Sequence, residues 1–359
     1  MAETFACIIH PLNLDLLAEA FEKEIIHKRE EIAKKILEWV PPFKCSDIEG
    51  IRSLQGRSVK GYLLSYTLLP EQILSLDSKF VLKKLINTGE VAEELGVKIL
   101  GLAAYTSQIG RRGILIQRAL TIPVTTGTNY TIAVVIESIL KLLERLRIDS
   151  YDLTLTVVGA SGNIGKIFTY MMWKYFKKII LVSRDMKKLS EIESTLEKKG
   201  CKRNKIIKTT NVKEFVQETD IMVTATNTPH TILDIKDLKP ATIVCDISLP
   251  KNISKEASNT RDDVIVIDGG IVRPPGKPNF NFYFGLPKGL CYACMAEPII
   301  LTLEKKLESF SLGGNINEEK VREIATLANK HGFQLAEFRS FGEVLKEEKL
   351  AKFKKYLRK

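Results

Sequence analysis

Three glycines in one short turn are the first residues of this chain whose types and spacing indicate chemistry. The segment Gly159-Ala160-Ser161-Gly162-Asn163-Ile164-Gly165 follows a run of β-forming residues, 153–158, and precedes a helical pattern, 164–174. Glycines at a strand-to-helix turn let backbone N–H groups approach a pyrophosphate, and the helix dipole favours its negative charge. The turn therefore predicts a dinucleotide site, with contacts from Gly159, Ser161, Gly162, Asn163, Ile164 and Gly165.

The end of the next strand, 179–182, indicates which dinucleotide binds. An Asp or Glu at this tip would hold the ribose 2′-hydroxyl of NAD, but the chain has Ser183 and Arg184 there, with Lys187 and Lys188 close behind. A hydroxyl and a guanidinium suit the 2′-phosphate of NADP, because arginine binds phosphate through two parallel hydrogen bonds. The alternative is that these basic residues only begin a solvated helix. The pattern favours NADPH as the cofactor.

A cysteine stands where a segment rich in Pro and Gly gives way to a helix. The helix dipole would favour the thiolate of Cys294, which lowers a thiol pKa below its free value of about 8.5. Such a thiolate exchanges readily with thioesters, and the bound acyl group could then accept a hydride. The alternatives are a thiol that only packs and a redox pair with Cys291. A metal site is not expected, because no second pair of zinc ligands occurs at a suitable spacing.

Several polar side chains could assist this chemistry. Thr106 and Ser107, and also Thr125 with Thr126, could donate hydrogen bonds to a developing oxyanion, but helix capping is the better explanation of the second pair. Glu297 lies one helical turn beyond the cysteine, where a carboxylate would raise the thiol pKa, and we expect it to be structural. His10 and His331 could supply a proton, although a structural role suits each of them too, and His230 follows a strand of the cofactor domain, where it could line the nicotinamide side.

Residues 1–148 form the first predicted domain, an α/β unit that would hold the substrate. Its elements are predicted from apolar runs, from a helix cap at Asn13 and from a helix stop at Gly96. They are strands at 5–9, 59–67 and 97–105, and helices at 13–39, 79–95 and 131–145.

Residues 149–272 form the second predicted domain, in which strands alternate with helices. This alternation predicts a parallel, doubly wound, Rossmann-like sheet that binds its ligand at the carboxyl ends of the strands. Thr226, Asn227 and Gly269 follow strands of this sheet, so we expect them to contact the cofactor. The remaining residues, 273–359, are predicted as a linker, 273–289, and a region of helices. The fold class is therefore α/β, with predicted sheet strands at 153–158, 179–183, 205–208, 221–225, 242–246 and 264–268.

Composition narrows the class of protein further. With 359 residues and 45% hydrophobic residues the chain can bury a core in each of two or three domains. It has no apolar run near the ~20 residues that span a bilayer and no secretory signal, and its six scattered cysteines suit reduced thiols, so a cytoplasmic protein is expected. The net charge of +11 suits nucleic acid, an anionic membrane surface or an acidic protein as a partner, and a basic amphipathic helix ends the chain.

Seven short blocks make the chain similar to a known family, the NADPH-dependent long-chain acyl-[acyl-carrier-protein] reductases of the cyanobacterial type, which form fatty aldehydes. The similarity runs from about Phe5 to Phe333. Its most discriminating blocks are an Ala-Cys-x-Ala-Glu segment and a later His-Gly-Phe. The blocks are Leu69-Pro70-Glu71, Tyr105-Thr106-Ser107, Thr125-Thr126-Gly127, Val157–Gly165, Asp268-Gly269-Gly270, Ala293–Glu297 and His331-Gly332-Phe333.

The resemblance implies a role for Cys294 and a class of substrate. In the family the cysteine of the Ala-Cys-x-Ala-Glu block carries the acyl group, and it falls on Cys294. The implied substrate is a thioester of acyl-carrier protein or coenzyme A, with possible transient membrane contact for the apolar product and with no nucleic acid. The chain departs from the family at Tyr130, where relatives have a histidine, so Tyr130 would have to take over any role of that histidine. The segment 273–289 has no clear match.

Three other readings stay open at this stage. A glutamyl-tRNA reductase-like enzyme would join thioester chemistry to the cofactor domain, but it should carry its cysteine in the N-terminal unit. A shikimate-type dehydrogenase would need a Lys–Asp pair that faces the cleft, and none is evident. A non-catalytic NADP-binding sensor would need only the nucleotide site.

Overall fold

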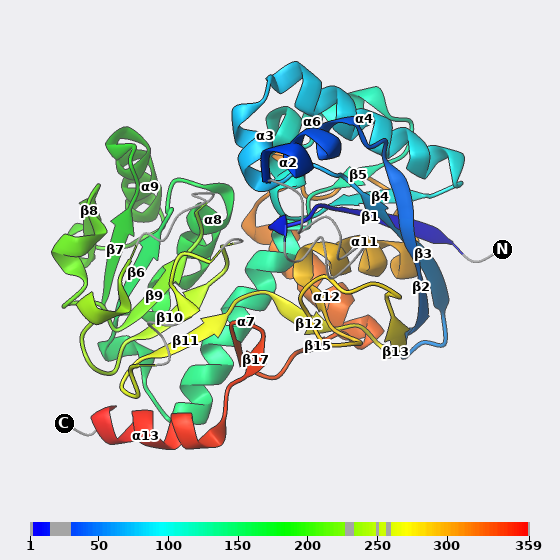
Figure 1. Ribbon diagram of the computed structural model, residues 1–359. Helices are drawn as coiled ribbons and strands as arrows, with labels where there is room; N and C mark the ends of the chain where they lie inside the picture. Colours follow the sequence, from blue (N-terminus) through cyan, green and yellow to red (C-terminus); the bar gives the residue numbers. More distant parts are fainter. Residues whose placement is uncertain (1–2, 15–29, 227–232, 249–250, 256–259, 358–359) are drawn as a thin grey trace. The chain divides into compact units, whose positions relative to one another are not determined.

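The computed structural model describes residues 3–14, 30–226, 233–248, 251–255 and 260–357. The chain divides into two compact units (Figure 1), Met1–Thr131 with Ile271–Ala336, and Ile132–Gly270 with Glu337–Lys359. The residues predicted as a separate linker and helical region after position 272 therefore contribute to both units. The first boundary lies inside helix α7 (Thr128–Leu146).

A six-stranded sheet is the base of the first unit. Four of its strands run parallel, and two antiparallel strands extend one edge. In spatial order the strands are β13 (Gly276–Asn279), β2 (Phe43–Arg52), β3 (Ser58–Ser65), β1 (Thr4–Ile9), β4 (Ile99–Leu102) and β5 (Val124–Thr125).

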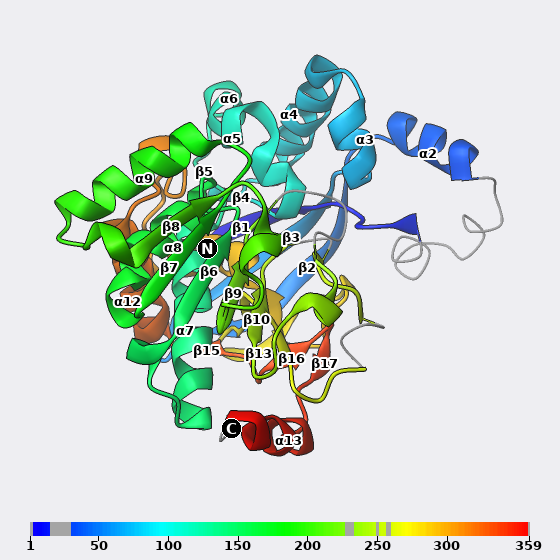
Figure 2. The ribbon, with the colours of Figure 1, turned by 90° about the vertical axis from the view of Figure 1, so that its left-hand side faces the viewer.

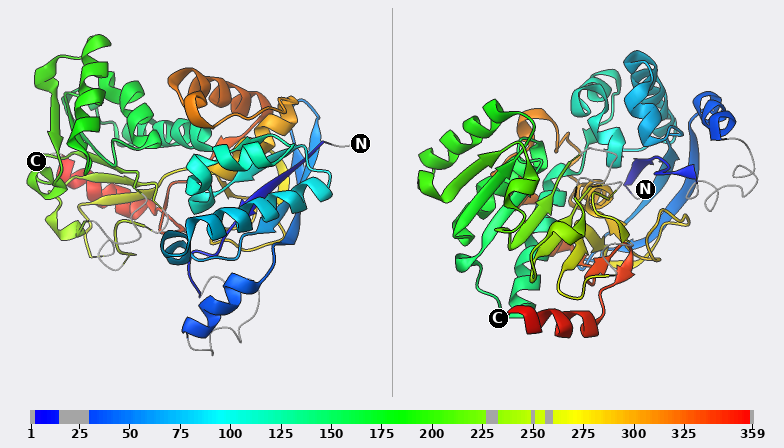
Figure 3. Two further views of the ribbon diagram at one scale, coloured as in Figure 1. Left: turned by 90° about the horizontal axis from the view of Figure 1, so that it is seen from above. Right: turned by 60° about the vertical axis from the view of Figure 1, so that its left-hand side comes forward.

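Helices and a small second sheet complete the first unit. Figure 3 shows α2, in dark blue, at the outer margin of this unit. The helices are α2 (Glu30–Trp39), α3 (Pro70–Ser75), α4 (Ser78–Glu94), α5 (Ile109–Arg112), α6 (Ile114–Ala119), α11 (Ala293–Glu304) and α12 (Glu318–His331). The small antiparallel sheet has the order β14 (Cys291–Tyr292), β12 (Ile271–Arg273) and β15 (Gln334–Leu335).

Alternation along the central strands assigns each face of the large sheet to different helices. Ile8 and Leu100 belong to an apolar core with side chains of α4 and α6. Their neighbours Cys7 and Gly101 face α11 instead, since the Cys7 thiol donates to the Met295 carbonyl at 3.5 Å. A Cβ on Gly101 would lie 2.7 Å from the ring of Pro298, so a glycine is needed for α11 to lie this close to β4.

Most of the predicted elements of the first unit are present. The strands predicted at 5–9, 59–67 and 97–105 correspond to β1, β3 and β4, and the helix predicted at 79–95 corresponds to α4. Helix α2 agrees with the end of the helix predicted at 13–39, of which residues 15–29 lie outside the described residues.

The prediction of a loop over 273–289 is wrong in part, because β13 pairs with β2 there. Two glycines permit this pairing. Gly50 has φ +72°, and a Cβ on it would lie 2.0 Å from the carbonyl oxygen of Lys277, while Gly276 has φ +92°. The pairing of β13 with β2 depends on close approach of the two backbones and not on apolar side chains. The sequence of β13 therefore shows no alternation of apolar residues, and the sequence pattern predicts a loop there.

The second unit contains the predicted parallel sheet (Figure 2). All six predicted strands are present to within two residues, and they flank the first strand in the order 3-2-1-4-5-6 that is typical of dinucleotide-binding folds. The order is β8 (Ile206–Thr209), β7 (Lys178–Val182), β6 (Thr154–Val158), β9 (Ile221–Thr224), β10 (Ile243–Asp246) and β11 (Ile265–Asp268), with helices α7, α8 (Asn163–Met172) and α9 (Met186–Lys198).

The C-terminal residues return to this second unit. A hairpin of β16 (Arg339–Ser340) and β17 (Glu343–Val344) donates two backbone N–H groups to Asp268, and α13 (Glu347–Leu357) follows. Leu350 and Phe353 of α13 are buried, so its apolar face is already covered. Within the described part of the chain, no helix is both long and apolar enough to cross a membrane.

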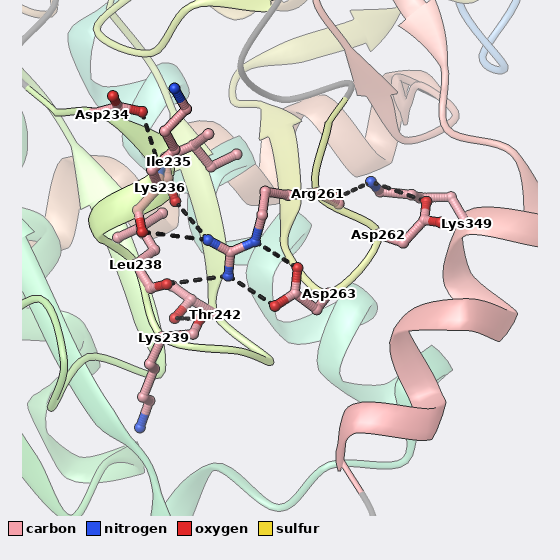
Figure 4. Close-up of polar contacts among 10 residues, drawn as sticks. All are labelled: Asp234, Ile235, Lys236, Leu238, Lys239, Thr242, Arg261, Asp262, Asp263 and Lys349. Atoms are coloured by element: carbon pink, nitrogen blue, oxygen red, sulfur yellow. Dashed lines mark hydrogen bonds and ion pairs between the residues drawn. The ribbon is translucent and has the colours of Figure 1, made fainter.

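Arg261 links three segments of the second unit (Figure 4). It binds Asp263 through two parallel hydrogen bonds of 2.6 and 2.7 Å, which lower the pKa of that carboxyl. Its own carbonyl accepts from Lys349 of α13, which also lies 3.7 Å from Asp262. The remaining guanidinium N–H groups donate to the carbonyls of Ile235, Lys236 and Leu238. This network anchors α13 to the end of the sheet.

Candidate active site

Cys294 is the second residue of α11, where the small sheet delivers the chain to the helix. Cys291 in β14 is paired with Val272 of β12, and the helix begins two residues later. The Cys294 side chain is half-buried, whereas Cys7 and Cys291 are buried. Of the three thiols of the first unit near this point, Cys294 is therefore the one that a reactant can reach.

The loop Thr125–Gly127 closes over the cysteine. A Cβ on Gly127 would lie 2.2 Å from the Cα and 2.4 Å from the carbonyl oxygen of Cys294, and its φ is +67°. Only glycine combines that backbone angle with such close contact. The close approach of this loop to Cys294 therefore explains why the Thr-Thr-Gly block ends in glycine.

A second segment contacts the sulfur from the other side. The backbone N–H of Ala104, which has an unusual φ of +49°, hydrogen-bonds the Cys294 sulfur. The next residue, Tyr105, donates its backbone N–H to Nε2 of His10 at 3.1 Å. Because that nitrogen accepts, the imidazole proton lies on Nδ1, 2.9 Å from the Pro11 carbonyl. His10 therefore holds the segment in place as a neutral ring.

Burial shifts the pKa values of both His10 and Cys294. It lowers the pKa of His10 to about 4, so His10 is neutral near pH 7 and is no proton donor there. Burial raises the pKa of Cys294 to about 11, although the N–H groups of Ala104 and Met295 lower it. The expectation that the helix N-terminus leaves a thiolate in the resting protein is therefore wrong, because loss of water outweighs the dipole.

Glu297 ties the loop to α11. Its carboxylate is fully buried, accepts from the Thr125 hydroxyl, and accepts from the Tyr130 backbone N–H at 2.9 Å. The side chain of Ser311 and the N–H of Gly127 also hydrogen-bond it. Burial raises the pKa of Glu297, and the carboxylate in turn raises that of Cys294. Glu297 positions the loop and does not activate the thiol.

The predicted hydroxyl donors already have acceptors. Thr106 and Ser107 donate to the carbonyls of Ala103 and Ala104, each at 2.6 Å, and so stabilise the turn that carries the Ala104 N–H. A role for Thr106 and Ser107 as oxyanion donors stays a prediction, since it requires their hydroxyl protons to turn away from these two carbonyls. Tyr130 is buried, and its ring meets Phe333 edge to face at 6.2 Å, which places the Tyr-for-His departure beside the His-Gly-Phe block.

His331 has a structural position. Its ring lies 2.9 Å from the Ser53 hydroxyl and 2.9 Å from Glu304, and it is fully buried. Glu304 ends α11, whereas Cys294 begins it, so about ten helical residues, or roughly 15 Å, separate His331 from the sulfur. His230 lies outside the described residues. Among the described residues, no group of His, Cys, Asp and Glu could hold a metal ion.

The glycine turn of the second unit has the shape of a phosphate cradle. Gly159 has φ +84°, and a Cβ on it would lie 2.3 Å from the Ala225 carbonyl oxygen. A Cβ on Gly165 would lie 2.4 Å from the Gly159 carbonyl oxygen, and Gly162 is the cap residue at the start of α8. Gly159 and Gly165 are thus required where they stand, and α8 presents its first N–H groups at the turn.

The strand tip next to this turn fits a 2′-phosphate. The hydroxyls of Ser183 and Ser161 are 2.5 Å apart, and Arg184 is exposed beside them. Asp185, the only nearby acid that could bind a ribose hydroxyl, caps α9 and accepts from the Lys188 N–H at 3.1 Å. The residues present therefore fit NADPH better than NADH.

The remaining predicted cofactor residues lie at the same edge of the sheet. Thr226 donates to Asn252 at 2.7 Å, and a Cβ on Gly269 would lie 3.0 Å from Ile247, so this glycine packs closely in its own unit. Asn227 lies outside the described residues. The contacts of Ala104 and His10 have no signal in the sequence, because they depend on a rare backbone angle and on a distant segment.

Comparison with known proteins finds a matching family model and curated relatives. The family model for shikimate / quinate 5-dehydrogenase matches residues 141–269. The chain is similar to the long-chain acyl-[acyl-carrier-protein] reductase of Synechococcus elongatus, with 26% identity over 325 residues, 85% of this chain and 92% of that protein. It is also 27% identical over 312 residues to the aminotransferase PigE of a Serratia species, covering 85% of this chain but only 36% of that much longer protein.

A solved structure is also similar to this chain. The L-tryptophan dehydrogenase of Nostoc punctiforme has a TM-score of 0.41 and 13% identity, covering 92% of this chain and 80% of that one. The family resemblance predicted from the motifs is confirmed by the similarity to the cyanobacterial reductase. The predicted cofactor, NADPH, is confirmed as well, and the class of protein is an NADP-dependent reductase.

Proposed function

We propose that this chain reduces an acyl thioester to an aldehyde with NADPH, and that Cys294 carries the acyl group. The observation that carries the proposal is the enclosure of one half-buried thiol by Gly127 on one side and by the Ala104 N–H on the other. A thiol that only fills space needs neither a hydrogen-bond donor nor a loop held over it by a buried carboxylate. The name of the Synechococcus relative supports the same reaction.

The first step is thiol exchange. The Cys294 sulfur attacks the thioester carbonyl, the bond from that carbon to the carrier sulfur breaks, and the Cys294 proton leaves with the carrier thiol. Because burial raises the pKa of Cys294, the thiol ionises only as it reacts, with the N–H groups of Ala104 and Met295 stabilising the negative sulfur. The exchange is close to neutral in energy, since one thioester replaces another.

The second step reduces the bound acyl group. NADPH, when bound, supplies a hydride to the acyl carbon. The resulting hemithioacetal releases the aldehyde as the carbon–sulfur bond breaks, and Cys294 regains a proton. In this proposal Thr106, Ser107 and Tyr130 surround the reacting carbonyl, and Glu297 and His10 act only by positioning the two segments that contact the sulfur.

The proposed reaction also requires a class of substrate. We propose a thioester whose carrier is acyl-carrier protein or coenzyme A, because both present the acyl group on an identical pantetheine thiol. The carrier-protein name of the Synechococcus relative supports the former.

A shikimate-type reaction would need a Lys–Asp pair beside the substrate. The structure contains a close pair, Lys251 with Asp268 at 3.0 Å, but Asp268 also accepts the N–H groups of Phe341 and Gly342. This pair anchors the C-terminal hairpin of the nucleotide-binding unit, so it does not favour that alternative.

Mass spectrometry of the intact protein tests the proposal. After incubation with a long-chain acyl-coenzyme A and no NADPH, we expect one acyl adduct on Cys294, which NADPH then discharges as aldehyde. Cys294→Ser should abolish the aldehyde and leave NADPH affinity unchanged, whereas Cys291→Ser and Cys7→Ser serve as matched thiol controls. Turnover by Cys294→Ser, or its loss only in Cys291→Ser, would show that the assignment is wrong.

A further inference from the structure

The segment Ile109-Gly110-Arg111-Arg112-Gly113 contains a left-handed turn. Its last four residues have φ values of +61°, +55°, +58° and +83°. Glycine adopts such angles freely, but two consecutive arginines do so only at a cost in free energy. Backbone strain that persists in a fold is often found at functional sites. The sequence therefore keeps two arginines where glycines would be easier to accommodate.

This turn lies beside the candidate nucleophile. A Cβ on Gly113 would lie 3.4 Å from the side chain of Thr126, and the next residue, Gly127, contacts Cys294. At its other end the same segment of chain begins at Ala104, whose N–H hydrogen-bonds the sulfur. The turn is therefore linked to the cysteine indirectly, through Thr126 and Gly127 on one side and through the segment that starts at Ala104 on the other.

The side chains of the turn divide by polarity. Ile109 is buried, while Arg111 and Arg112 are exposed. Among the described residues, Arg111 has no ion-pair partner, although the chain has 43 Asp and Glu residues. The strained turn thus presents positive charge to solvent close to the site of thiol exchange.

Resting on the proposed function, we infer that Arg111, together with Arg112, binds the phosphate at the end of the pantetheine arm of the thioester substrate. The arm places its thiol in the site and its phosphate some distance outside, and a guanidinium binds phosphate through two parallel hydrogen bonds. Carrier protein and coenzyme A share this phosphate, so the arginines recognise what the two carriers have in common. They act in binding and are not catalytic residues.

The double substitution Arg111→Gly with Arg112→Gly tests the inference, because it removes the charges and also relieves the strain. Binding of 4′-phosphopantetheine, measured by calorimetry in saturating NADPH, should weaken on the order of tenfold. Pantetheine without phosphate should bind parent and variant equally. The melting temperature should be unchanged or higher, which a structural role for the arginines would not produce. Arg118→Ala, an exposed arginine on α6, is the matched control.

Turnover tests whether the phosphate is recognised on both carriers, and it separates the two proposals. The KM for both acyl-carrier protein and acyl-coenzyme A should rise about tenfold in the double variant, while an acyl N-acetylcysteamine thioester, which has no phosphate, should react as with the parent. Equal binding of 4′-phosphopantetheine by parent and variant would overturn the inference. A parent that binds it but gains no acyl group on Cys294 would overturn the proposed function instead, and the role of the arginines would stand.

Discussion

At the scale of single residues, the sulfur of Cys294 shows how opposing effects set reactivity. Burial raises its pKa to about 11, and the N–H groups of Ala104 and Met295 reduce that rise. The thiol is therefore protected from ionising in the resting protein, where a free thiolate would be oxidised or alkylated. The same N–H groups are in place to stabilise charge as it develops, without the cost of reorganising water.

Arg184 provides the sharpest test of cofactor selectivity. It is exposed at the tip of β7, beside the paired hydroxyls of Ser183 and Ser161. Because a hydrogen bond to a charged group contributes roughly 1.5–3 kcal/mol, Arg184→Ala should weaken NADPH binding by roughly 10- to 100-fold. NADH, which has no 2′-phosphate, should bind as before. Fluorescence titration of both cofactors measures this difference.

The control for Arg184 is a basic residue of the same helical region that is far from the strand tip. Lys198 is exposed in the last turn of α9, so Lys198→Ala removes the same charge from the surface of the unit. It should leave both affinities unchanged. Equal losses of NADPH and NADH binding in Arg184→Ala would contradict a contact to the 2′-phosphate.

At the scale of elements, one buried carboxylate joins the start of α7 and the loop before it to α11. Glu297 accepts from Thr125 and from the Tyr130 N–H, and both groups belong to the segment that closes over Cys294. In Glu297→Gln one of the two accepting oxygens becomes an NH2 group, so either the Tyr130 N–H or the Thr125 hydroxyl faces a donor in place of an acceptor. Two donors without an acceptor cost about 1–3 kcal/mol, so the melting temperature should fall by several degrees.

The same substitution should expose the nucleophile. Once the loop is loosened, Gly127 no longer holds the cysteine covered, and iodoacetamide should alkylate Cys294 several-fold faster at pH 8, as measured by peptide mass spectrometry. The loss of the Glu297 charge, which raises the pKa of Cys294, acts in the same direction. Thr302→Val is the matched control, because Thr302 is buried in the same helix and bonds only the Pro298 carbonyl. If Glu297→Gln lowered the melting temperature and left the alkylation rate unchanged, the carboxylate would stabilise the fold without positioning the loop.

At the scale of the whole molecule, the two units differ in how far the sequence predicts them. The six strands of the nucleotide-binding unit are short, largely apolar runs of four or five residues. The rules of parallel crossover connections leave only a few common strand orders. The glycine turn and the basic end of β7 at Arg184 are each formed by residues close together in the sequence. Residue type and spacing therefore suffice to predict them. Cys294 is likewise visible from its helix start and its motif.

The first unit is harder to predict because its contacts are long-range. β12, β14 and β15 have only two or three residues each, too few to show alternation, and they come from both sides of α11 and α12. The raised pKa of Cys294 follows from burial by segments 170 to 190 residues away in sequence, which no local pattern reports. The helix start alone predicts the opposite direction of the shift.

The contact between His10 and the backbone N–H of Tyr105 is one of these long-range contacts, and the pH dependence of stability tests it. The pKa of His10 is about 4 in the folded chain, against an ordinary value near 6.5. A group with a lowered folded pKa contributes stability that is fully present above pH 6.5 and is lost as the pH falls towards 4. For His10 this contribution is roughly 3 kcal/mol, because each pKa unit corresponds to about 1.4 kcal/mol.

The expected result is a falling urea midpoint for the parent between pH 6.5 and pH 4, with a smaller fall in His10→Gln. The Gln side-chain oxygen can still accept the Tyr105 N–H but does not titrate, and all other groups are common to both proteins, so the difference between the curves reports His10 alone. Protonated His10 can no longer accept that N–H, so the segment that carries the Ala104 N–H should lose its contact with His10 in the same pH range. Parallel curves for the two proteins would mean that His10 is not held as the neutral acceptor that positions this segment.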